Sequence, residues 1–210
     1  MTDWDQRFSD GEYPQETEPS AMLRRYVDAL PTGRALDIAA GTGRNAVFLA
    51  DQGYRIDALD GSRVGLEITR ERAAERNAAA RLELIQADIP SYEFPIETYD
   101  LVTISFYRAV DRFPDIKEAL ADGGVLYVEH HLRTTEPIDS GPSGDRCRFS
   151  ANELLRSMLD LTVLGYDERI ETRSDGRTAA IARVMARKGT APRQSYPRLG
   201  NDTVENDLKP

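Results

Sequence analysis

The chain is poor in several residue types that mark particular classes of protein. Its 210 residues include one cysteine, Cys147, so no disulfide can form within the chain, and we expect a cytoplasmic location. No apolar run approaches the roughly 18–20 residues that a membrane-spanning helix needs. Residues 1–5 are polar and acidic, so we also expect no signal peptide. These absences favour a cytoplasmic protein that has no membrane partner.

Lysine is also scarce, and acidic side chains dominate the charge. Three lysines stand against 36 aspartates and glutamates, and the net charge is −9. Because an acidic surface repels a phosphate backbone, we expect no nucleic-acid partner. Two explanations of the acidity stay open. One is adaptation to high internal salt, in which screened carboxylates keep a protein dissolved, and the other is an ordinary acidic cytoplasmic protein.

The residues that are present suffice for one folded domain. Hydrophobic residues make up 40% of the chain and charged residues 30%, which is too apolar for a chain that is disordered throughout. A length of 210 residues fits a single domain. We expect this domain to span residues 1–188, with residues 1–18 as an N-terminal cap segment. The polar, proline-containing residues 189–210 are expected to form a disordered tail.

Strand and helix patterns alternate along the chain. The expected strands are residues 35–39, 54–59, 82–86, 99–106 and 125–131. The expected helices are residues 20–30, 44–52, 62–77, 111–121 and 150–159, the last with a Ser150–Glu153 capping box. Residues 161–172 and 178–187 then predict a hairpin around the turn at 174–177. This order predicts a doubly wound, Rossmann-like α/β fold, with a mostly parallel seven-stranded sheet that closes in an antiparallel hairpin.

A glycine-rich turn follows the first expected strand. Gly41 and Gly43 can adopt backbone angles that other residues avoid, and they let a ligand approach the main chain. Free N–H groups at the start of the next helix would point into the same crevice. Asp37, just before the turn, could pair with a ligand ammonium group. By itself, a Gly-x-Gly turn is also compatible with a plain tight turn.

Two further acids end the second and third expected strands. Asp60 lies where an acid accepts hydrogen bonds from both ribose hydroxyls of a nucleoside. Asp88 could accept from an adenine amino group, with Ile89 against the ring. Because open α/β sheets bind ligands at the carboxyl ends of their strands, three acids and a bare turn at successive strand ends together predict one nucleoside site.

The sequence resembles the class I methyltransferases, and among them the tellurite-resistance-type group of small-molecule methyltransferases. The matching segments are WDQRF at 4–8, ALDIAAGTGRNAVFLA at 35–50, IDALD at 56–60, QADI at 86–89, YDLV at 99–102 and LADGGVL at 120–126. Ala40 replaces the common cysteine before the turn, and Gly61 replaces the residue usual after the second acid. Neither change removes a group that binding needs.

The resemblance implies S-adenosylmethionine as the cofactor. The turn at 41–45 would hold its methionine part, Asp60 its ribose, and Asp88 its adenine. Ser105 and Phe106 would line the pocket beside the sulfonium. The expected cofactor-binding residues are Asp37, Ala39, Gly41, Thr42, Gly43, Arg44, Asn45, Asp60, Gly61, Asp88, Ile89 and Ser105. The N-terminal segment at 4–8 would pack over the cofactor.

Methyl transfer from a sulfonium needs no catalytic acid or base when the acceptor is a soft anion. The catalytic residues therefore stay unknown. The residues expected to line the substrate side, beyond the fourth and fifth strands, are Tyr107, Arg108, Glu129, His130, His131 and Arg133, and the catalytic candidates among them are Tyr107, Arg108, His130 and His131. The histidine pair could supply a base for an amine or hydroxyl acceptor. Arg146 and Arg148 could bind an anionic acceptor or belong to a solvated loop. No third histidine or cysteine is near, so we expect no metal site.

The predicted function is methyl transfer to a small molecule such as a thiol, a metalloid oxyanion or another metabolite, by a monomer or homodimer. Gly41, Gly43 and Ala46 with Asp60 also nearly satisfy a dinucleotide fingerprint, so an NAD-dependent oxidoreductase is one alternative. The closing hairpin and Asp88 argue against it. A non-catalytic S-adenosylmethionine-binding protein is the second alternative, since methyl transfer requires no signature residue.

Overall fold

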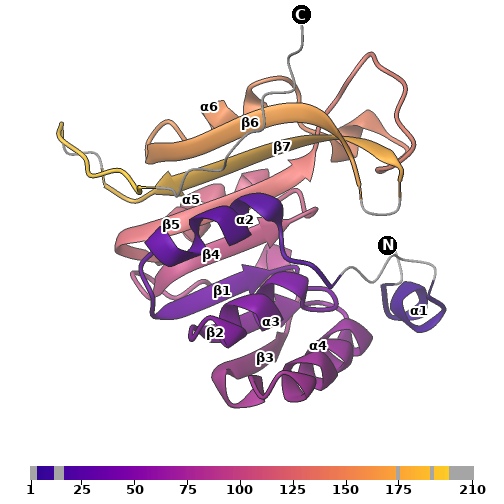
Figure 1. The fold of residues 1–210 in the computed structure, drawn as a ribbon, viewed down its shortest axis with the longest axis vertical. Helices are drawn as coiled ribbons and strands as arrows, with labels where there is room; N and C mark the ends of the chain where they lie inside the picture. Colours follow the sequence, from indigo (N-terminus) through magenta and orange to yellow (C-terminus); the bar gives the residue numbers. More distant parts are fainter. Residues whose placement is uncertain (1–3, 12–16, 174–175, 190–191, 199–210) are drawn as a thin grey trace, which may run out of the picture.

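The computed structural model describes residues 4–11, 17–173, 176–189 and 192–198. In these ranges the chain builds one seven-stranded sheet (Figure 1) with the order β3-β2-β1-β4-β5-β7-β6. The strands are β1 (Arg34–Ile38), β2 (Arg55–Asp60), β3 (Leu82–Gln86), β4 (Tyr99–Ser105), β5 (Leu120–His131), β6 (Thr162–Thr172) and β7 (Thr178–Arg187). Strands β1 to β5 pair in parallel, whereas β7 is antiparallel to β5 and β6. The predicted doubly wound sheet with its closing hairpin is confirmed.

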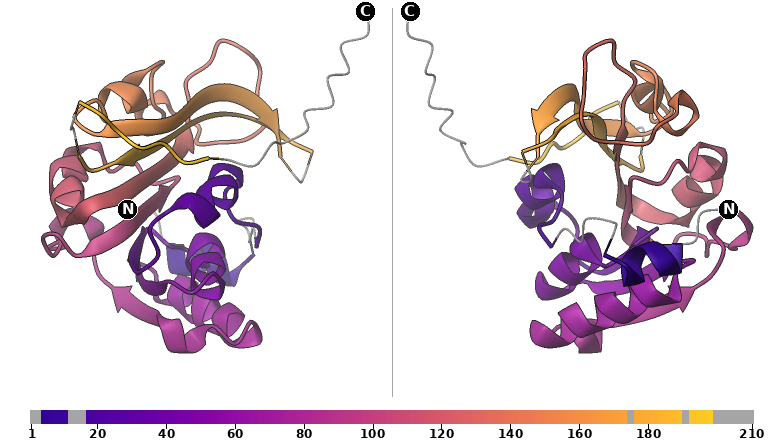
Figure 2. Two further views of the ribbon diagram at one scale, coloured as in Figure 1. Left: turned by 60° about the vertical axis from the view of Figure 1, so that its left-hand side comes forward. Right: turned by 90° about the vertical axis from the view of Figure 1, so that its right-hand side faces the viewer.

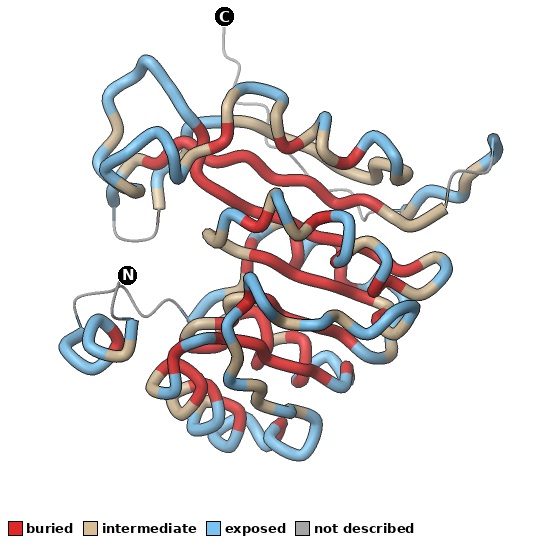
Figure 3. Tube along the Cα trace, turned by 180° about the vertical axis from the view of Figure 1, so that it is seen from behind, coloured by how far each residue is buried: buried red, intermediate tan, exposed pale blue. Residues whose placement is uncertain are grey.

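Helices cover both faces of this sheet (Figures 1 and 2). They are α1 (Trp4–Ser9), α2 (Ala21–Tyr26), α3 (Arg44–Asp51), α4 (Arg63–Glu75), α5 (Phe113–Ala119) and α6 (Glu153–Arg156). Short 3-10 turns lie at η1 (Val27–Ala29), η2 (Ala79–Arg81), η3 (Ile89–Ser91), η4 (Val110–Arg112) and η5 (Asp145–Cys147). Helices α2, α3 and α4 pack on one face, while α5 and α6 pack on the other, each over its own apolar cluster. The inner strands β1, β2, β4 and β7 and most of β5 are buried, whereas the edge strands β3 and β6 are partly exposed (Figure 3).

Some elements differ from the expected bounds. The helix expected at 150–159 is only one turn long, and it begins at Glu153 because Asn152 takes a left-handed conformation with φ of +61°. Half of the expected capping box is present, since the Ser150 N–H donates to the Glu153 carboxylate at 2.8 Å. The strand expected at 125–131 begins earlier, at Leu120. The helix expected at 20–30 divides into α2 and η1.

The hairpin and the tail are described only in part. Residues 174 and 175 lie outside the described residues, but the Arg173 N–H donates to the Arg177 carbonyl at 2.8 Å and closes the turn. In the tail expected to be disordered, residues 192–198 are described as irregular chain, and Arg187 donates to the Ser195 carbonyl at 2.6 Å. The remaining residues after 189 lie outside the described ranges, so the disordered tail and the boundary at 188 stay predictions.

The carboxyl ends of the parallel strands meet at one edge of the sheet, beside α1 (Figure 1). From β1 the chain builds outward to β2 and β3 on one side, and to β4 and β5 on the other. The gap between β1 and β4 is therefore the topological switch point, where open α/β sheets bind ligands. Along the described ranges, no helix is both long enough and apolar enough to cross a bilayer.

Candidate active site

The backbone is strained where β1 and β4 end. Ala39 follows β1 with φ of +55°, and Phe106 follows β4 with φ of +57°. Non-glycine residues in this region cost of order 1–3 kcal/mol each, and such strain concentrates at functional sites. Because β1 and β4 are neighbours in the sheet, the two strained residues flank the switch point. The candidate site therefore lies at this switch point.

The glycine-rich turn packs its backbone closely against α4. Gly41 and Gly43 have φ of +57° and +79°, which only glycine adopts without strain. A Cβ at Gly43 would lie 2.4 Å from the Thr69 side chain, and a Cβ at Gly65 would lie 2.7 Å from the Gly41 carbonyl oxygen. Because these positions lack side chains, the backbone of the glycine-rich turn packs directly against the backbone of α4.

Replacing Gly65 with alanine is expected to harm the protein, although helix propensity alone would predict a gain in stability. Replacing a mid-helix glycine with alanine normally stabilises a protein by roughly 0.5–1 kcal/mol. At Gly65 the new methyl group would push on the Gly41 carbonyl, so we expect Gly65→Ala to weaken S-adenosylhomocysteine binding at least about tenfold. Calorimetric titration measures this affinity. Gly144→Ala is the control, because a Cβ there would meet nothing within 4 Å. Equal affinities in the two variants would contradict the expectation.

Asp60 connects β2 to the turn. One carboxylate oxygen accepts from the Gly41 N–H at 2.7 Å, and the other accepts from the Ser62 N–H at 2.7 Å. Burial raises the pKa of Asp60 above its ordinary value. Hydroxyl groups that donate to the ionised form would offset that penalty, and each oxygen keeps a further lone pair. Gly61 adds no side chain beside this carboxylate, so the site fits a ribose diol.

Asp37 lies beneath the turn. Its oxygens accept from the Thr103 hydroxyl at 2.6 Å and from the Ala46 N–H at 3.1 Å, and its burial raises the pKa to about 6. The carboxylate thereby holds the first turn of α3 against β4. The expected direct contact with a ligand ammonium stays a prediction.

The remaining residues of the turn are held by partners far away in the sequence. Arg72 of α4 donates to both the carbonyl and the hydroxyl of Thr42, each at 2.8 Å. The Asn45 side chain accepts from the Ser20 N–H at 3.1 Å and donates to the Ser105 hydroxyl at 3.0 Å. The structure therefore brings Asn45 and Ser105 together, as the predicted site requires.

The segment after β3 is fixed by Arg112, a residue that sequence reasoning missed. Asp88 is exposed at the start of η3, and Ile89 is buried. The Arg112 guanidinium donates to the Ile89 carbonyl at 3.0 Å and to the Tyr92 carbonyl at 2.7 Å. No local sequence signal indicates contacts with carbonyls that lie 20 or more residues earlier. Arg112 positions the segment expected to receive adenine.

Helix α1 lies against the start of α4. Asp5 accepts from the Ser62 hydroxyl at 2.5 Å and from the Val64 N–H at 3.1 Å. Phe8 is buried, and its ring lies 3.5 Å from where a Cβ of Gly41 would be. This arrangement puts an aromatic ring from the N-terminal segment over the glycine-rich turn.

A buried carboxylate joins the turn to the closing hairpin. Glu129 of β5 accepts from Arg44 at 2.5 Å and from the Ser20 hydroxyl at 3.0 Å through one oxygen. Through the other it accepts from Arg183 at 2.6 Å and from the Tyr127 hydroxyl at 3.1 Å. Burial alone would raise the pKa of Glu129, but the two arginines hold it at about 2. The expected cofactor residue Arg44 thus pairs its guanidinium with β5.

Arg108 and Tyr107 are two of the four candidate catalytic residues. Arg108 pairs with the Glu153 carboxylate of α6 and covers the Phe149 ring at 5.0 Å. Tyr107 is half-buried, and burial together with the charge of Asp88 raises its pKa, so its hydroxyl group stays protonated on the adenine side. The catalytic roles expected of these two side chains stay predictions.

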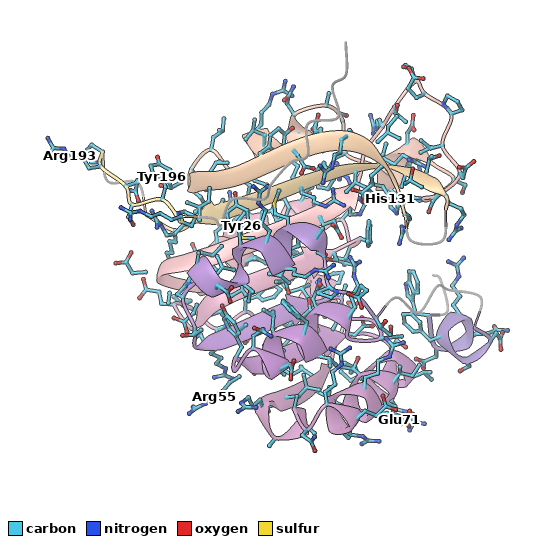
Figure 4. All side chains as sticks on the ribbon, viewed as in Figure 1. Tyr26, Arg55, Glu71, His131, Arg193 and Tyr196 are labelled. Atoms are coloured by element: carbon cyan, nitrogen blue, oxygen red, sulfur yellow. The ribbon has the colours of Figure 1, made fainter. Side chains whose placement is uncertain are left out.

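The histidine pair lies beside Phe106. The His131 and Phe106 ring centroids are 4.7 Å apart, and those of His130 and Phe106 are 6.5 Å apart. His130 Nδ1 lies 3.3 Å from the His131 carbonyl, and this contact places a proton on that nitrogen. Figure 4 shows His131 at one end of the sheet and Tyr196 toward the opposite end. Within the described residues, no group of three histidines, cysteines or acids could hold a metal ion.

These histidines predict a pH dependence of stability. Burial lowers the pKa of both His130 and His131 to about 4. Between about pH 6.5 and pH 4 the unfolded chain takes up protons that the folded chain does not, so stability falls as the pH drops. We expect His131→Asn to lose roughly 2–3 kcal/mol less than the parent over this interval, measured by urea unfolding. The raised pKa of Asp37 has the opposite effect, since proton uptake by this residue stabilises the folded protein as the pH falls. This effect is the same in the parent and in the variant, so it cancels when their stabilities are compared. Identical pH slopes would contradict the expectation.

Comparisons with known proteins agree with this geometry. Residues 35–124 match the methyltransferase domain family. A demethylmenaquinone methyltransferase of Clavibacter sepedonicus is 41% identical over 82 residues, which are 39% of this chain and 32% of that protein. The chain thus spans about a third of the length of this curated relative.

Solved structures share the fold over most of the chain. TehB from Haemophilus influenzae superposes with a TM-score of 0.70 and 22% identity, covering 89% of this chain and 67% of that one. The [4+2]-cyclase SpnF superposes with a TM-score of 0.65 and 19% identity, covering 85% and 86%. At these identities the likeness establishes the fold alone. Residues 35–124 thus resemble a methyltransferase domain, and the described chain shares its fold with these solved structures.

Proposed function

We propose that the protein transfers a methyl group from S-adenosylmethionine to a small-molecule acceptor. The observation that carries this proposal lies at the carboxyl ends of β1 and β2, beside the switch point, where the Gly41 N–H of the bare turn donates to the Asp60 carboxylate at 2.7 Å. A turn without side chains suits close approach by a ligand, and a buried carboxylate suits two adjacent hydroxyls. The strained backbone on both sides of the crevice supports the same location.

The chain's own residues would bind and orient the two reactants. S-adenosylmethionine supplies a methyl group already activated on a sulfonium, so the protein mainly aligns the acceptor and excludes water. The turn at 41–45 would hold the methionine part, Asp60 the ribose, and Asp88 with Ile89 the adenine. Ser105 and Phe106 would border the reacting methyl group. Phe8 would cover the turn from the N-terminal side.

The acceptor is left open by the comparisons. The match to the methyltransferase domain ends at residue 124, before His130, His131 and the loop that follows them. The acceptor of a relative therefore cannot be carried over to this chain. The negative net charge favours a small molecule over nucleic acid. Thiols, metalloid oxyanions and small aromatic metabolites are the classes to test, with quinones added because the Clavibacter relative is named for one.

Two other functions remain as competitors. An NAD-dependent oxidoreductase is disfavoured by the antiparallel hairpin at β6 and β7, because dehydrogenase halves continue with further βα units. A protein that binds S-adenosylmethionine without transferring methyl is compatible with the same crevice. The SpnF neighbour, named a cyclase, illustrates that this fold accommodates different chemistries.

Binding and turnover separate these functions. Calorimetry should give tight S-adenosylhomocysteine binding and no NADH binding. Release of S-adenosylhomocysteine is then followed with each class of acceptor. NADH binding would support the oxidoreductase, whereas cofactor binding without turnover on any acceptor would support the non-catalytic protein. We also propose a cytoplasmic monomer or homodimer, which light scattering can distinguish.

A further inference from the structure

Asn45 lies in the first turn of α3, and both ends of its side-chain amide have partners within the protein. The sequence places Asn45 among the residues expected to bind the cofactor, yet the residue is only 1% exposed. Its Oδ1 accepts from the Ser20 N–H at 3.1 Å, and its Nδ2 donates to the Ser105 hydroxyl oxygen at 3.0 Å. The contribution of this side chain to a ligand site is therefore indirect, through Ser105.

The Ser20 backbone fixes the direction of both hydrogen bonds. A backbone N–H can only donate, so the Asn45 oxygen must face Ser20 and the Asn45 NH2 group must face Ser105. Because an NH2 group can also only donate, the Ser105 oxygen must accept in this bond, and the Ser105 hydroxyl proton is directed elsewhere. Among the described residues, no group accepts that proton.

Ser20 is held in place by the buried carboxylate of Glu129. Ser20 is 2% exposed, and its hydroxyl donates to Glu129 at 3.0 Å and accepts from Arg44 at 3.2 Å. Both bonds involve a charged group, and such hydrogen bonds are stronger than neutral ones. The relay, which consists of Ser20, Asn45 and Ser105, is thus anchored at its start and has one direction.

The relay ends where the surface of the protein opens at the switch point. Strand β4 is buried from Leu101 to Ile104, but Ser105 and the following Phe106 are partly exposed. On the neighbouring strand, Ala39 and Gly41 follow the buried end of β1 and are also partly exposed. These four partly exposed residues border surface that a ligand can reach, at the edge of the sheet where β1 and β4 end (Figure 1). The Ser105 proton is available at this surface.

The charges around Ser105 favour an anionic group of the ligand. The first turn of α3 lies beside Ser105, and its N-cap residue, Gly43, provides no side-chain cap. A helix N-terminus carries positive partial charge and attracts anions. Glu129 does not oppose an anion, because two arginines neutralise it. Asp37 is 3% exposed, and its carboxylate accepts from the Thr103 hydroxyl within the core.

We propose that the Ser105 hydroxyl donates a hydrogen bond to the carboxylate of the cofactor's amino-acid part, and that Asn45 is the positioning residue that sets the direction of this bond. The inference rests on the proposed function. The carboxylate is the only anionic group of S-adenosylmethionine, and the turn at 41–45 is expected to hold the amino-acid part. Ser105 also borders the methyl group in this arrangement, because only a short alkyl chain joins the sulfonium to the amino-acid carbon.

Three adenosine compounds, titrated calorimetrically into the full-length protein, test the inference. S-adenosylhomocysteine carries the carboxylate and the amino group, its decarboxylated analogue carries only the amino group, and 5′-methylthioadenosine carries neither. We expect Ser105→Ala to weaken S-adenosylhomocysteine binding at least about tenfold, through loss of a hydrogen bond to a charged group, and to leave the other two affinities unchanged. Ser105→Thr keeps a hydroxyl and should recover most of this loss. Ser143→Ala, in an exposed loop, is the control and should bind all three compounds like the parent.

Asn45→Asp tests the direction of the relay, because aspartate and asparagine have nearly the same shape. The introduced carboxylate still accepts from the Ser20 N–H but cannot donate, so the Ser105 hydroxyl would donate to it and its proton would no longer be available to the ligand. Ser105→Ala should therefore cost about tenfold in the parent and nothing in the Asn45→Asp background, at an alkaline pH that keeps the introduced group ionised. A direct effect of the added charge is present in both proteins of that background and cancels.

The inference is overturned if Ser105→Ala keeps the parental affinity for S-adenosylhomocysteine or weakens all three compounds alike. Equal weakening of S-adenosylhomocysteine and its decarboxylated analogue would mean that Ser105 contacts the amino group instead, and this result also overturns it. The same cost of Ser105→Ala in both backgrounds would show that Asn45 does not act through Ser105. In each of these cases the parent still binds the cofactor, so the proposed function survives. If the parent binds none of the three compounds, the proposed function fails, and this inference fails with it.

Discussion

Replacing Glu129 with leucine is expected to lower the free energy of unfolding by about 3–5 kcal/mol, because removing one partner of a buried ion pair leaves uncompensated charge. In this variant Arg183 still pairs with Glu171 at 2.5 Å and Asp167 at 3.4 Å, so Arg44 is the side chain that loses its carboxylate partner. We therefore expect the loss of stability to lie near the lower end of the range of about 3–5 kcal/mol. Urea unfolding followed by circular dichroism measures the change.

A matched control separates this effect from the loss of any acid. Glu67→Gln removes an exposed pair with Arg63, at 3.5 Å, and should cost less than about 1 kcal/mol. Adding Arg44→Met to Glu129→Leu should recover part of the stability, since it removes the unpaired charge. If Glu129→Leu and Glu67→Gln lowered the free energy of unfolding equally, the buried network would contribute no more to stability than an exposed ion pair.

The same carboxylate has a defined pH window. The folded-state pKa of Glu129, about 2, lies below the ordinary value for glutamate. Its stabilising contribution is therefore complete above about pH 4.3 and is lost as the pH falls through about 2. Glu129→Leu should differ from the parent most at neutral pH, and the difference should shrink in acid.

Replacing Asp60 with alanine is the second large expected effect. We expect S-adenosylhomocysteine affinity to fall by roughly 1.5–3 kcal/mol, the value of hydrogen bonds to a charged group, which is about 10–150-fold. Asp60 also holds the Gly41 N–H at 2.7 Å, so the variant loses both a ligand contact and a support of the turn. Calorimetric titration measures the affinity.

Two companions to this variant make the result interpretable. Asp51→Asn, at the exposed end of α3, changes the same charge far from the crevice and should leave the affinity unchanged. The thermal midpoint of Asp60→Ala shows whether the protein stays folded. A folded Asp60→Ala protein with parental affinity would mean that the ribose assignment is wrong.

Much of the fold follows from local patterns. The strands at β1 to β4 and the hairpin of β6 and β7 are apolar runs or alternations bounded by glycine and polar turns, and they form within one residue of the expected bounds at either end. The helix expected at 150–159 starts late because Asn152 is left-handed, and the Asn152 N–H donates to Glu168 of β6 at 2.7 Å, a contact that the local sequence does not indicate. The strand at β5 starts early for a similar reason, since pairing with Tyr99 extends it.

The candidate cofactor site was predictable because its residues follow strand ends. Asp60, Asp88 and the turn at Gly41 could be placed at one edge by topology alone. The partners that orient them were not predictable, because Arg112 and Arg72 reach across 20 or more residues without any local signal. The same holds for Arg148, which an irregular segment carries to His131.

The sequence by itself determined the order of strands and helices, the closing hairpin and the position of the cofactor turn, because periodicity and glycine placement are local properties of the chain. Only the tertiary structure decided which charged groups are used within the protein and which face the crevice. Burial and pairing set those roles, and both depend on contacts between strands and loops far apart in the sequence. Glu129 is thereby committed to two arginines, while Asp88 stays exposed at the end of β3.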